Sequence, residues 1–457
     1  MLFTTQWVST VLPEHAGVAT DQIPIEHITT NSKQKLSKSL FIPIVGERFD
    51  GHDFIKEAFD NGAIAAVWDK KKERPRFLPT DFPLFYTDDT TFALQQLAAA
   101  YRRDVDPIVV GITGSNGKTS TKDMVAAIGK TSYRTHHTLG NFNNLIGLPL
   151  TILSMPSNTE LLVLEMGMDR FGEIEQLSNI SKPDIAIITN IGESHLEFLG
   201  SREGIAKAKV EILSGLHENG ALIIDGDEPL LAQTKDLRRK VVTCGLSTSN
   251  QFTVSNVQIE PHQTRFTVNQ NDHYTIPLLG KHHAVNATYA IQVGKLLKVD
   301  DSNINRALAH LEWTAMRFEI MKGTGGASII NDAYNASPTS MKAAIDVVQA
   351  MQGYQNKILV LGDIYELGPD SLELHRSVVD HIDEAYFTAV FTIGKDASAI
   401  ADELHQRYPS FKAIHVEEKY DIINDLKPYL QEDSLILFKA SRGMQFETLI
   451  ERLINPS

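Results

Sequence analysis

The sequence is poor in cysteine and carries fewer basic than acidic residues. Its 457 residues include one cysteine, Cys244, so an internal disulfide framework is excluded and a reducing compartment is favoured. Lysine and arginine total 43 against 57 aspartates and glutamates, which gives a formal net charge of −14 at pH 7. This balance argues against broad binding to nucleic acids or anionic membranes, but it leaves room for an anionic small ligand in a local pocket.

Long apolar runs are also missing. No stretch of about 18 apolar residues occurs, so no membrane insertion is expected. Residues 1–17 lack a basic segment followed by an apolar one, so no secretion signal is expected. We therefore expect a cytoplasmic protein, with a monomer as the simplest state. Hydrophobic residues still make up 42% of the chain, which is enough to exclude disorder as its main state.

The order of apolar strands and helices predicts an α/β fold with three domains, which agrees with roughly 100 to 200 residues per domain. Residues 1–104 would form a small N-terminal α/β domain. Residues 105–313 would form a central, P-loop ATPase-like domain with a parallel sheet, because apolar strands alternate there with helices. Within 246–279, apolar residues recur at every second position, which predicts a small antiparallel patch of strands. Residues 314–457 would form a C-terminal, Rossmann-like open α/β domain.

The same patterns give ranges for the main elements. Strands are expected at 39–45, 63–68, 108–113, 161–166, 184–191, 221–225, 328–332, 357–362, 389–393 and 435–439. Helices are expected at 51–61, 90–103, 118–129, 339–351, 371–385, 396–407, 419–430 and 444–453. Ligands of open α/β sheets bind beyond the carboxyl ends of the strands, so residues directly after a strand are candidates for a site.

The most informative local signal is a glycine-rich turn between an expected strand and an expected helix. It reads Gly111-Ile-Thr-Gly114-Ser115-Asn116-Gly117-Lys118-Thr119-Ser120. Glycines let backbone N–H groups approach an anion, and a helix N-terminus adds a favourable dipole, so the turn is predicted to bind nucleotide phosphates. Lys118 would reach the terminal phosphates and Thr119 would hold Mg²⁺. A standard P-loop has glycine where this chain has Ile112, and a ligand-free turn with a surface lysine is the alternative.

This turn resembles the ATP loop of the Mur ligases, which build the peptide of bacterial peptidoglycan. Further segments resemble the family's motifs in the family's order and extend over the whole chain. They are 46–54, 140–151, 165–168, 190–197, 206–212, 331–338 and 361–368, followed by His375. Two positions differ from the family pattern: Asn31-Ser32-Lys33 replaces Asp-Ser-Arg, and His282-His283 replaces His-Asn.

The resemblance implies an ATP-dependent amide ligase with the substrates UDP-N-acetylmuramoyl-tripeptide and D-alanyl-D-alanine. A carboxylate is a poor electrophile at neutral pH. The family transfers the γ-phosphoryl group of ATP to it, so that the amine attacks an acyl phosphate. The N-terminal domain would bind the UDP end, the central domain ATP, and the C-terminal domain would close over ATP and bind the dipeptide. The implied cofactors are ATP and two Mg²⁺ ions.

The resemblance also implies catalytic and metal-binding roles for particular residues. Lys118, Glu165, His195 and Lys209 would be catalytic. Thr119, Glu165, His195 and Lys209 would hold Mg²⁺, with Lys209 carbamylated by CO₂ and so converted from a cation into an anion. Lys207 and Lys209 lie two apart on an expected helix, so only one of them can face the site. Lys209 occupies the matching position.

The remaining contacts implied by the resemblance are divided between nucleotide and substrate. ATP would contact the glycine-rich turn and, in addition, Asn286, Arg317 and Asp332. The substrate-binding candidates are Asn31, Ser32, Lys33, Gly46, Asp50 and His52 at the UDP end, Asn144 in the central domain, and Tyr334, Asn335 and Asp363 near the dipeptide.

Three alternatives remain open. Another member of the superfamily, such as a different Mur ligase or folylpolyglutamate synthetase, would use the same turn, although the Asp-Ala-Tyr-Asn-Ala stretch within 331–338 argues against both. A P-loop ATPase or small-molecule kinase would release or transfer phosphate without needing an amine. A nucleotide-gated binding protein would hydrolyse nothing, and the combination of Lys118, Glu165 and His195 argues against it.

Overall fold

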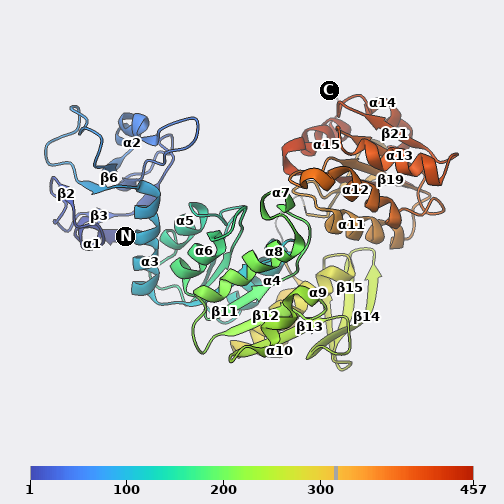
Figure 1. The fold of residues 1–457 in the computed structure, drawn as a ribbon, viewed down its shortest axis with the longest axis horizontal. Helices are drawn as coiled ribbons and strands as arrows, with labels where there is room; N and C mark the ends of the chain where they lie inside the picture. Colours follow the sequence, from blue (N-terminus) through green and yellow to red (C-terminus); the bar gives the residue numbers. More distant parts are fainter. Residues whose placement is uncertain (1, 313–316, 456–457) are drawn as a thin grey trace.

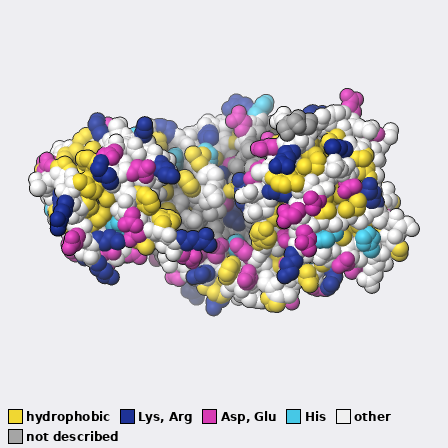
Figure 2. Space-filling model, turned by 90° about the horizontal axis from the view of Figure 1, so that it is seen from above, with side chains coloured by type: hydrophobic (Ala, Val, Ile, Leu, Met, Phe, Trp, Pro, Cys, Tyr) yellow, Lys and Arg dark blue, Asp and Glu magenta, His cyan; other side chains and the backbone are white. Residues whose placement is uncertain are grey.

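The computed structural model describes residues 2–312 and 317–455, which contain three large, mostly parallel sheets in the order of the sequence. In Figure 1 the N-terminal part (blue) and the C-terminal part (orange to red) lie at opposite ends, with the central part (green to yellow) between them. Seen from above, the surface is hollowed between these two ends (Figure 2). The predicted α/β class is confirmed. The expected domain border at 313/314 lies outside the described residues.

The N-terminal sheet has the strand order β2-β7-β6-β5-β4, and only its β2–β7 pair is antiparallel. Its strands are β2 (His15–Ala16), β4 (His27–Thr29), β5 (Ser39–Phe41), β6 (Ala63–Asp69) and β7 (Leu84–Thr87), while β1 (Phe3–Thr4) pairs separately with β3 (Pro24–Ile25). The helices are α1 (Thr5–Val11), α2 (Ile55–Asp60) and α3 (Thr90–Val105). The expected strand 39–45 ends early, at Phe41, shortly before Pro43, which has no N–H to donate to a ladder.

The central sheet has nine strands in the order β16-β15-β14-β13-β12-β11-β8-β10-β9. These are β8 (Ile108–Thr113), β9 (Thr135–His137), β10 (Leu161–Glu165), β11 (Ile185–Ile188), β12 (Ala221–Asp225), β13 (Lys240–Gly245), β14 (Phe252–Glu260), β15 (Gln263–Val268) and β16 (Asp272–Ile276). All neighbouring strands from β9 across the sheet to β14, with β8 among them, pair in parallel. Strands β14, β15 and β16 pair antiparallel and form the predicted antiparallel patch, which continues the same sheet.

Helices cover both faces of the central sheet, which explains why its inner strands are apolar throughout. They are α4 (Lys118–Lys130), α5 (Gly147–Leu153), α6 (Glu173–Ser181), α7 (Leu196–Leu199), α8 (Arg202–Val210), α9 (Lys281–Leu296) and α10 (Asp301–Ala309). One core contains residues of α5, α6 and α8, and another contains residues of α4, α9 and α10. Helix α3 packs on α5 and joins the N-terminal part to the first core (Figure 1).

Strands β8 and β11 are neighbours in this sheet, and the chain leaves β8 toward β9 on one side but leaves β11 toward β12 on the other. In open α/β sheets such a switch point is where ligands bind, because loops from neighbouring strands separate there and leave a crevice. The glycine-rich turn follows β8, Glu165 ends β10, and the 189–195 segment follows β11. The topology therefore gathers these three motifs at one edge.

The C-terminal sheet has the order β17-β18-β22-β19-β20-β21, with only β17 antiparallel to its neighbour. Its strands are β17 (Glu319–Lys322), β18 (Ser328–Asn331), β19 (Asn356–Gly362), β20 (Ala389–Ile393), β21 (Ala413–Val416) and β22 (Ser434–Lys439). The α-helices are α11 (Pro338–Ala350), α12 (Ser371–Arg376), α13 (Ser398–Arg407), α14 (Ile423–Leu426) and α15 (Phe446–Ile454).

Two helices expected in this part are shorter than predicted. The 371–385 helix is wrong beyond Arg376: the chain turns into the 3₁₀ segment Ser377–His381, and the Ser377 hydroxyl donates to the Leu374 carbonyl (2.7 Å) in competition with the helical ladder. The 419–430 helix reduces to α14 and a 3₁₀ turn at Lys427–Tyr429, because Pro428 has no N–H for an α-helical bond. Among the described helices, none is long and apolar enough to cross a membrane.

Candidate active site

A cavity of about 1120 Å³ lies at the switch point, between the central and C-terminal sheets. Its walls combine the glycine-rich turn with side chains from both parts. They include Ser115 to Ser120, Glu165, His195, Asn286, Arg317, Asp332, Tyr334 and Asn335. Residues far apart in the sequence, most of which were expected to contact ATP or metal, therefore line one cavity.

The glycine-rich turn is held open by left-handed glycines and by the loop that follows β11. Gly114 has φ +149° and Gly117 has φ +79°. Asn190 accepts the N–H of Ser115 on its carbonyl and the N–H of Asn116 on its side-chain oxygen, each at 3.0 Å. The first helical bond runs from Thr121 N–H to the Gly117 carbonyl, so the N–H groups of residues 117–120 have no acceptor among the described residues. Unpaired N–H groups at a helix start are suited to an anion.

Replacing Gly114 with alanine is expected to disrupt the turn. The new Cβ would overlap the hydroxyl of Thr189, and φ +149° is strained for an L side chain, so we expect stability to fall by about 1–3 kcal/mol. Nucleotide affinity should fall at least tenfold in the fraction that remains folded. Denaturant unfolding and titration of a fluorescent ATP analogue would measure both. Gly353→Ala is the matched control, because φ there is +93° but nothing lies within 4 Å.

Lys118 occupies the turn's interior. Its ammonium donates to the Gly114 carbonyl (2.7 Å) and the Ser115 carbonyl (3.2 Å). Burial lowers the pKa of Lys118, the Glu165 carboxylate opposes this effect, and the Arg317 guanidinium adds to it. A phosphate would offer this ammonium stronger acceptors than neutral carbonyls.

Thr119 and Glu165 form the oxygen-rich wall of the cavity. Both are buried, and the Thr119 hydroxyl donates to Glu165 Oε2 (2.8 Å) while Asn143 donates to Oε1 (2.8 Å). Arg317 Nη2 donates to the same Thr119 oxygen (2.8 Å), and its guanidinium lies 4.4 Å from the Tyr334 ring centre. A carboxylate beside a hydroxyl fits Mg²⁺, which prefers hard oxygen ligands and shares them with substrate phosphates.

Lys209 and Lys207 point in different directions from α8, as predicted. Lys209 is 2% exposed, and its ammonium has no hydrogen bond or ion pair within the described residues. Burial, and secondarily the charge of Lys118, lower the pKa of Lys209 well below its ordinary value. Lys207 is exposed and lies 5.7 Å from the Phe171 ring centre. Of the two, Lys209 is therefore the amine held buried beside the phosphate turn's lysine.

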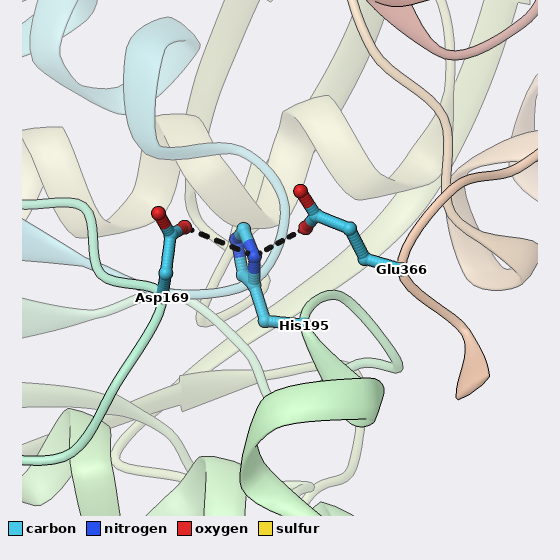
Figure 3. Close-up of side chains that lie close together, drawn as sticks. All are labelled: Asp169, His195 and Glu366. Carbon is cyan, nitrogen blue, oxygen red and sulfur yellow. Dashed lines mark ion pairs between the residues drawn. The ribbon is translucent and has the colours of Figure 1, made fainter. Parts of the chain in front are cut away.

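His195 lies between two carboxylates from different parts of the chain (Figure 3). Its Nδ1 is 2.6 Å from Glu366 Oε2 and 3.2 Å from Asp169 Oδ1, although the N–H is not aligned for a hydrogen bond with either oxygen. Contact with His195 lowers the pKa of Glu366 despite the opposing effect of burial. Nε2 is left without a partner among the described residues.

Asn286 and the histidines before it form the floor beside the turn. A Cβ at Gly117 would lie 2.7 Å from the amide atoms of Asn286, so the two residues are in close contact. The His282 and His283 ring centres lie 4.1 Å apart with the rings tilted by 43°, and desolvation lowers the pKa of His282 to about 4 and that of His283 well below its ordinary value. Both imidazoles are therefore neutral at neutral pH, and Nδ1 of His283 has no hydrogen-bond partner among the residues that the structure describes.

The C-terminal part touches the turn directly. Ser337 donates to Asn116 Oδ1 (3.1 Å), and the Thr339 hydroxyl donates to Glu193 Oε2 (2.7 Å). Asp332 pairs with the buried Lys439 (2.6 Å) at the cavity wall. These contacts arise at the carboxyl end of β18 and the start of α11, so both sheets present their ligand-binding edges to one cavity.

Several candidates lie outside this cavity. The six N-terminal ones (Asn31, Ser32, Lys33, Gly46, Asp50 and His52) belong to the first sheet's loops, and Gly114, Asn144, Lys209 and Asp363 are also absent from the cavity's lining. Asn144 accepts the N–H groups of Ile146 and Gly147 (3.2 and 2.8 Å) at the start of α5. Asp363 accepts three backbone N–H groups, of residues 395–397, at 2.7 to 3.0 Å. Both side chains therefore hold loops in place.

The N-terminal candidates are partly engaged in local contacts. Asn31 accepts the N–H of Lys33 (3.0 Å), and Ser32 donates to Glu57 (2.5 Å). His52 is buried between Asp50, 2.6 Å from its Nδ1, and the Asp69 N–H, 3.2 Å from its Nε2. Burial raises the pKa of Asp50, but hydrogen bonds from Lys72 and His52 outweigh it and lower that pKa to about 2. The Lys33 side chain remains exposed.

The residues of the site that were not among the candidates include Asn143, Asp169 and Glu366. Each stands inside or directly beside a segment that resembles a family motif. The spacing of these residues along the chain does not show which side chains of a motif point into the site. Their contacts with Glu165 and His195 appear only once the segments are folded together.

Comparisons with known proteins agree with this geometry. Three family profiles match: "Mur ligase family, catalytic domain" at 24–102, "Mur ligase middle domain" at 112–294, and "Mur ligase, glutamate ligase domain" at 316–442. A UDP-N-acetylmuramoyl-tripeptide--D-alanyl-D-alanine ligase of Bacillus subtilis (strain 168) is 46% identical over 435 residues, spanning 95% of this chain and 94% of that protein.

Solved structures give the same result. A crystal structure of MurF from Acinetobacter baumannii has a TM-score of 0.86 at 29% identity and covers 99% of this chain and 98% of that chain. A crystal structure of MurF ligase from Thermotoga maritima in complex with ADP has a TM-score of 0.81 at 29% identity, covering 94% of this chain and 97% of that one. The similarity therefore extends over nearly the full length of all three parts.

Proposed function

The chain belongs to the Mur ligase family, and we infer that it is an ATP-dependent ligase that joins D-alanyl-D-alanine to UDP-N-acetylmuramoyl-tripeptide. The observation that carries this inference is the cavity in which a phosphate-binding turn, a buried hydroxyl–carboxylate pair and an arginine from the C-terminal part meet. The similarity to a relative named for this reaction extends over 95% of the chain. An ADP-bound neighbour supports ATP as the nucleotide.

The proposed reaction is the one that the family carries out. ATP phosphorylates the substrate carboxylate to an acyl phosphate, the dipeptide amine attacks it, and the amide forms as phosphate leaves. Lys118 and the N–H groups of residues 117–120 bind the phosphates, and Arg317 brings a second cation against the turn from the C-terminal part. Negative charge builds on the phosphoryl oxygens, so preorganised donors and cations provide most of the stabilisation.

Thr119, Glu165, His195 and a carbamylated Lys209 are the residues we propose to hold two Mg²⁺ ions. Bound Mg²⁺ would neutralise phosphoryl charge and orient the oxygens of ATP. The hydroxyl and carboxylate of Thr119 and Glu165 already lie in contact. Burial lowers the pKa of Lys209 well below its ordinary value, which favours the uncharged amine, the form that reacts with CO₂.

We propose that the three domains bind different parts of the substrates. We propose a UDP-binding domain at 1–104, an ATP-binding domain at 105–313, and a domain at 314–457 that closes over ATP and binds the dipeptide. Asn31 to Lys33 and the loop from Gly46 to His52 would serve the UDP end. Tyr334 and Asn335 line the cavity and would face the dipeptide, and Asp332 the ribose. The reaction would occur in the cytoplasm, by a monomer.

Product analysis tests the proposal. The full chain, incubated with UDP-N-acetylmuramoyl-tripeptide, ATP, Mg²⁺ and D-alanyl-D-alanine, is expected to form the amide-linked pentapeptide with one ADP and one phosphate per amide. Parallel reactions with L-lysine, D-glutamate or L-glutamate as the amine should give no product. Phosphate release that does not depend on an amine would point instead to an ATPase, and the proposal would be wrong.

A further inference from the structure

The contact between His195 and Glu366 joins two parts of the chain. His195 follows β11 of the central sheet, whereas Glu366 follows β19 of the C-terminal sheet. Besides the 2.6 Å side-chain contact, the Glu197 N–H donates to the Glu366 carbonyl (3.1 Å), and Gly368 approaches Glu197 closely. Figure 3 shows Glu366 reaching the imidazole from the side opposite Asp169. Backbone and side chain thus form one interface around the ring.

Both residues have strained backbones. His195 has φ +64° and Glu366 has φ +63°, in the left-handed region that residues with a Cβ rarely adopt. Strain of this kind costs of the order of 1 kcal/mol or more per residue and persists only where the surrounding structure enforces it. Two such residues in contact across an interface indicate that both side chains are held where they meet.

The two carboxylates approach the same ring nitrogen. Asp169 Oδ1 and Glu366 Oε2 both lie beside Nδ1, 3.2 and 2.6 Å away, so Nε2 is the ring nitrogen that neither carboxylate contacts. A neutral imidazole with its proton on Nδ1 presents the lone pair of Nε2. Histidines that bind metals commonly give their other N–H to a carboxylate, which fixes the tautomer and the ring orientation.

We propose that Glu366 is a positioning residue for His195, supplied by the C-terminal sheet, so that the imidazole is oriented only while that part is docked on the central part. This goes beyond the proposed function and rests on its assignment of His195 to the metal. Docking of the C-terminal part, which brings the dipeptide, thereby completes the phosphate site. Premature ATP cleavage would be limited, because His195 keeps only the longer contact with Asp169 until Glu366 arrives.

Glu366→Gln in the full chain tests this role. Loss of a partner of this kind typically costs 10- to 100-fold, so we expect kcat to fall by about that factor, with KM for ATP and for D-alanyl-D-alanine within about threefold. Mn²⁺ binding in the presence of a nonhydrolysable ATP analogue, followed by electron paramagnetic resonance, should weaken about tenfold. Glu366→Asp should recover part of the loss. Glu384→Gln, at an exposed glutamate in the turn before β20 of the same sheet, is the control and should match wild type.

A double-mutant cycle separates positioning from independent effects. In a His195→Ala background, Glu366→Gln should cause no further loss, because its partner is already gone. Additive losses, unchanged Mn²⁺ binding, or a rise in KM for the dipeptide with kcat intact would each overturn the proposal. The Mn²⁺ measurement needs no turnover. A wild-type enzyme that forms no amide would therefore refute the proposed function while leaving the positioning role to be judged by metal binding.

Discussion

Lys118→Met is expected to reduce kcat by about 10²- to 10³-fold, which is the usual cost of removing one donor that stabilises transition-state charge. The ammonium is buried in the turn, where two backbone carbonyls now hold it, 2.7 and 3.2 Å away. Phosphoryl oxygens would replace those carbonyls and gain a charge-assisted bond that strengthens as charge builds on the transferred group. Steady-state kinetics with a coupled ADP assay would measure the loss.

Methionine keeps most of the volume of the lysine stem, so Lys118→Met should fold. Its melting temperature should stay within a few degrees of wild type. Lys130→Met is the matched control, because Lys130 lies in the last turn of the same helix and is exposed. Activity within threefold of wild type in Lys118→Met would show that this turn does not bind the transferred phosphate, and the nucleotide site would have to be sought elsewhere.

Apolar, locally determined elements were predicted well from the sequence. The strands β8, β12 and β20 begin and end where the pattern places them, because each is a short, mostly apolar and mostly buried run. Helix α4 begins at Lys118 as predicted, directly after Gly117, which adopts a left-handed conformation. The helix ends one residue later than predicted, at Lys130. Elements that depend on long-range contacts were missed, such as β17, which pairs with β18 at the edge of the described sheet.

The site was predictable in part, for a similar reason. A strand followed by a glycine turn and a helix specifies a phosphate-binding geometry locally, and the position of Glu165 at the end of β10 follows from topology. By contrast, Asn143 and Asn144 are neighbours in one motif, and only folding shows that Asn143 reaches Glu165 while Asn144 begins α5. Glu366 meets His195 across two sheets, a pairing that periodicity along the chain does not encode.

Lys209→Ala is expected to lower kcat by at least about 10²-fold, because it removes the carbamate that we propose to support Mg²⁺ against the phosphates. Alanine leaves a gap at a position that is 2% exposed, so a short carboxylate such as acetate or propionate could enter and replace the lost anion. Partial recovery of activity at millimolar carboxylate is therefore expected. Lys207→Ala, two residues earlier and exposed, should match wild type with or without added carboxylate.

Lys209→Met separates the chemical role from folding. Its side chain fills the gap, so activity should be lost without rescue by carboxylates. Because burial lowers the pKa of Lys209, the folded protein without carbamate disfavours an ammonium that the unfolded chain would carry at neutral pH. This group then costs stability at neutral pH, and the cost shrinks as pH rises toward the ordinary lysine value. At pH about 7, the denaturant concentration at the unfolding midpoint should consequently be equal or higher for Lys209→Met than for uncarbamylated wild type. The difference between the two midpoints should become smaller at pH about 9. Full activity in both Lys209 variants would remove the carbamate from the mechanism.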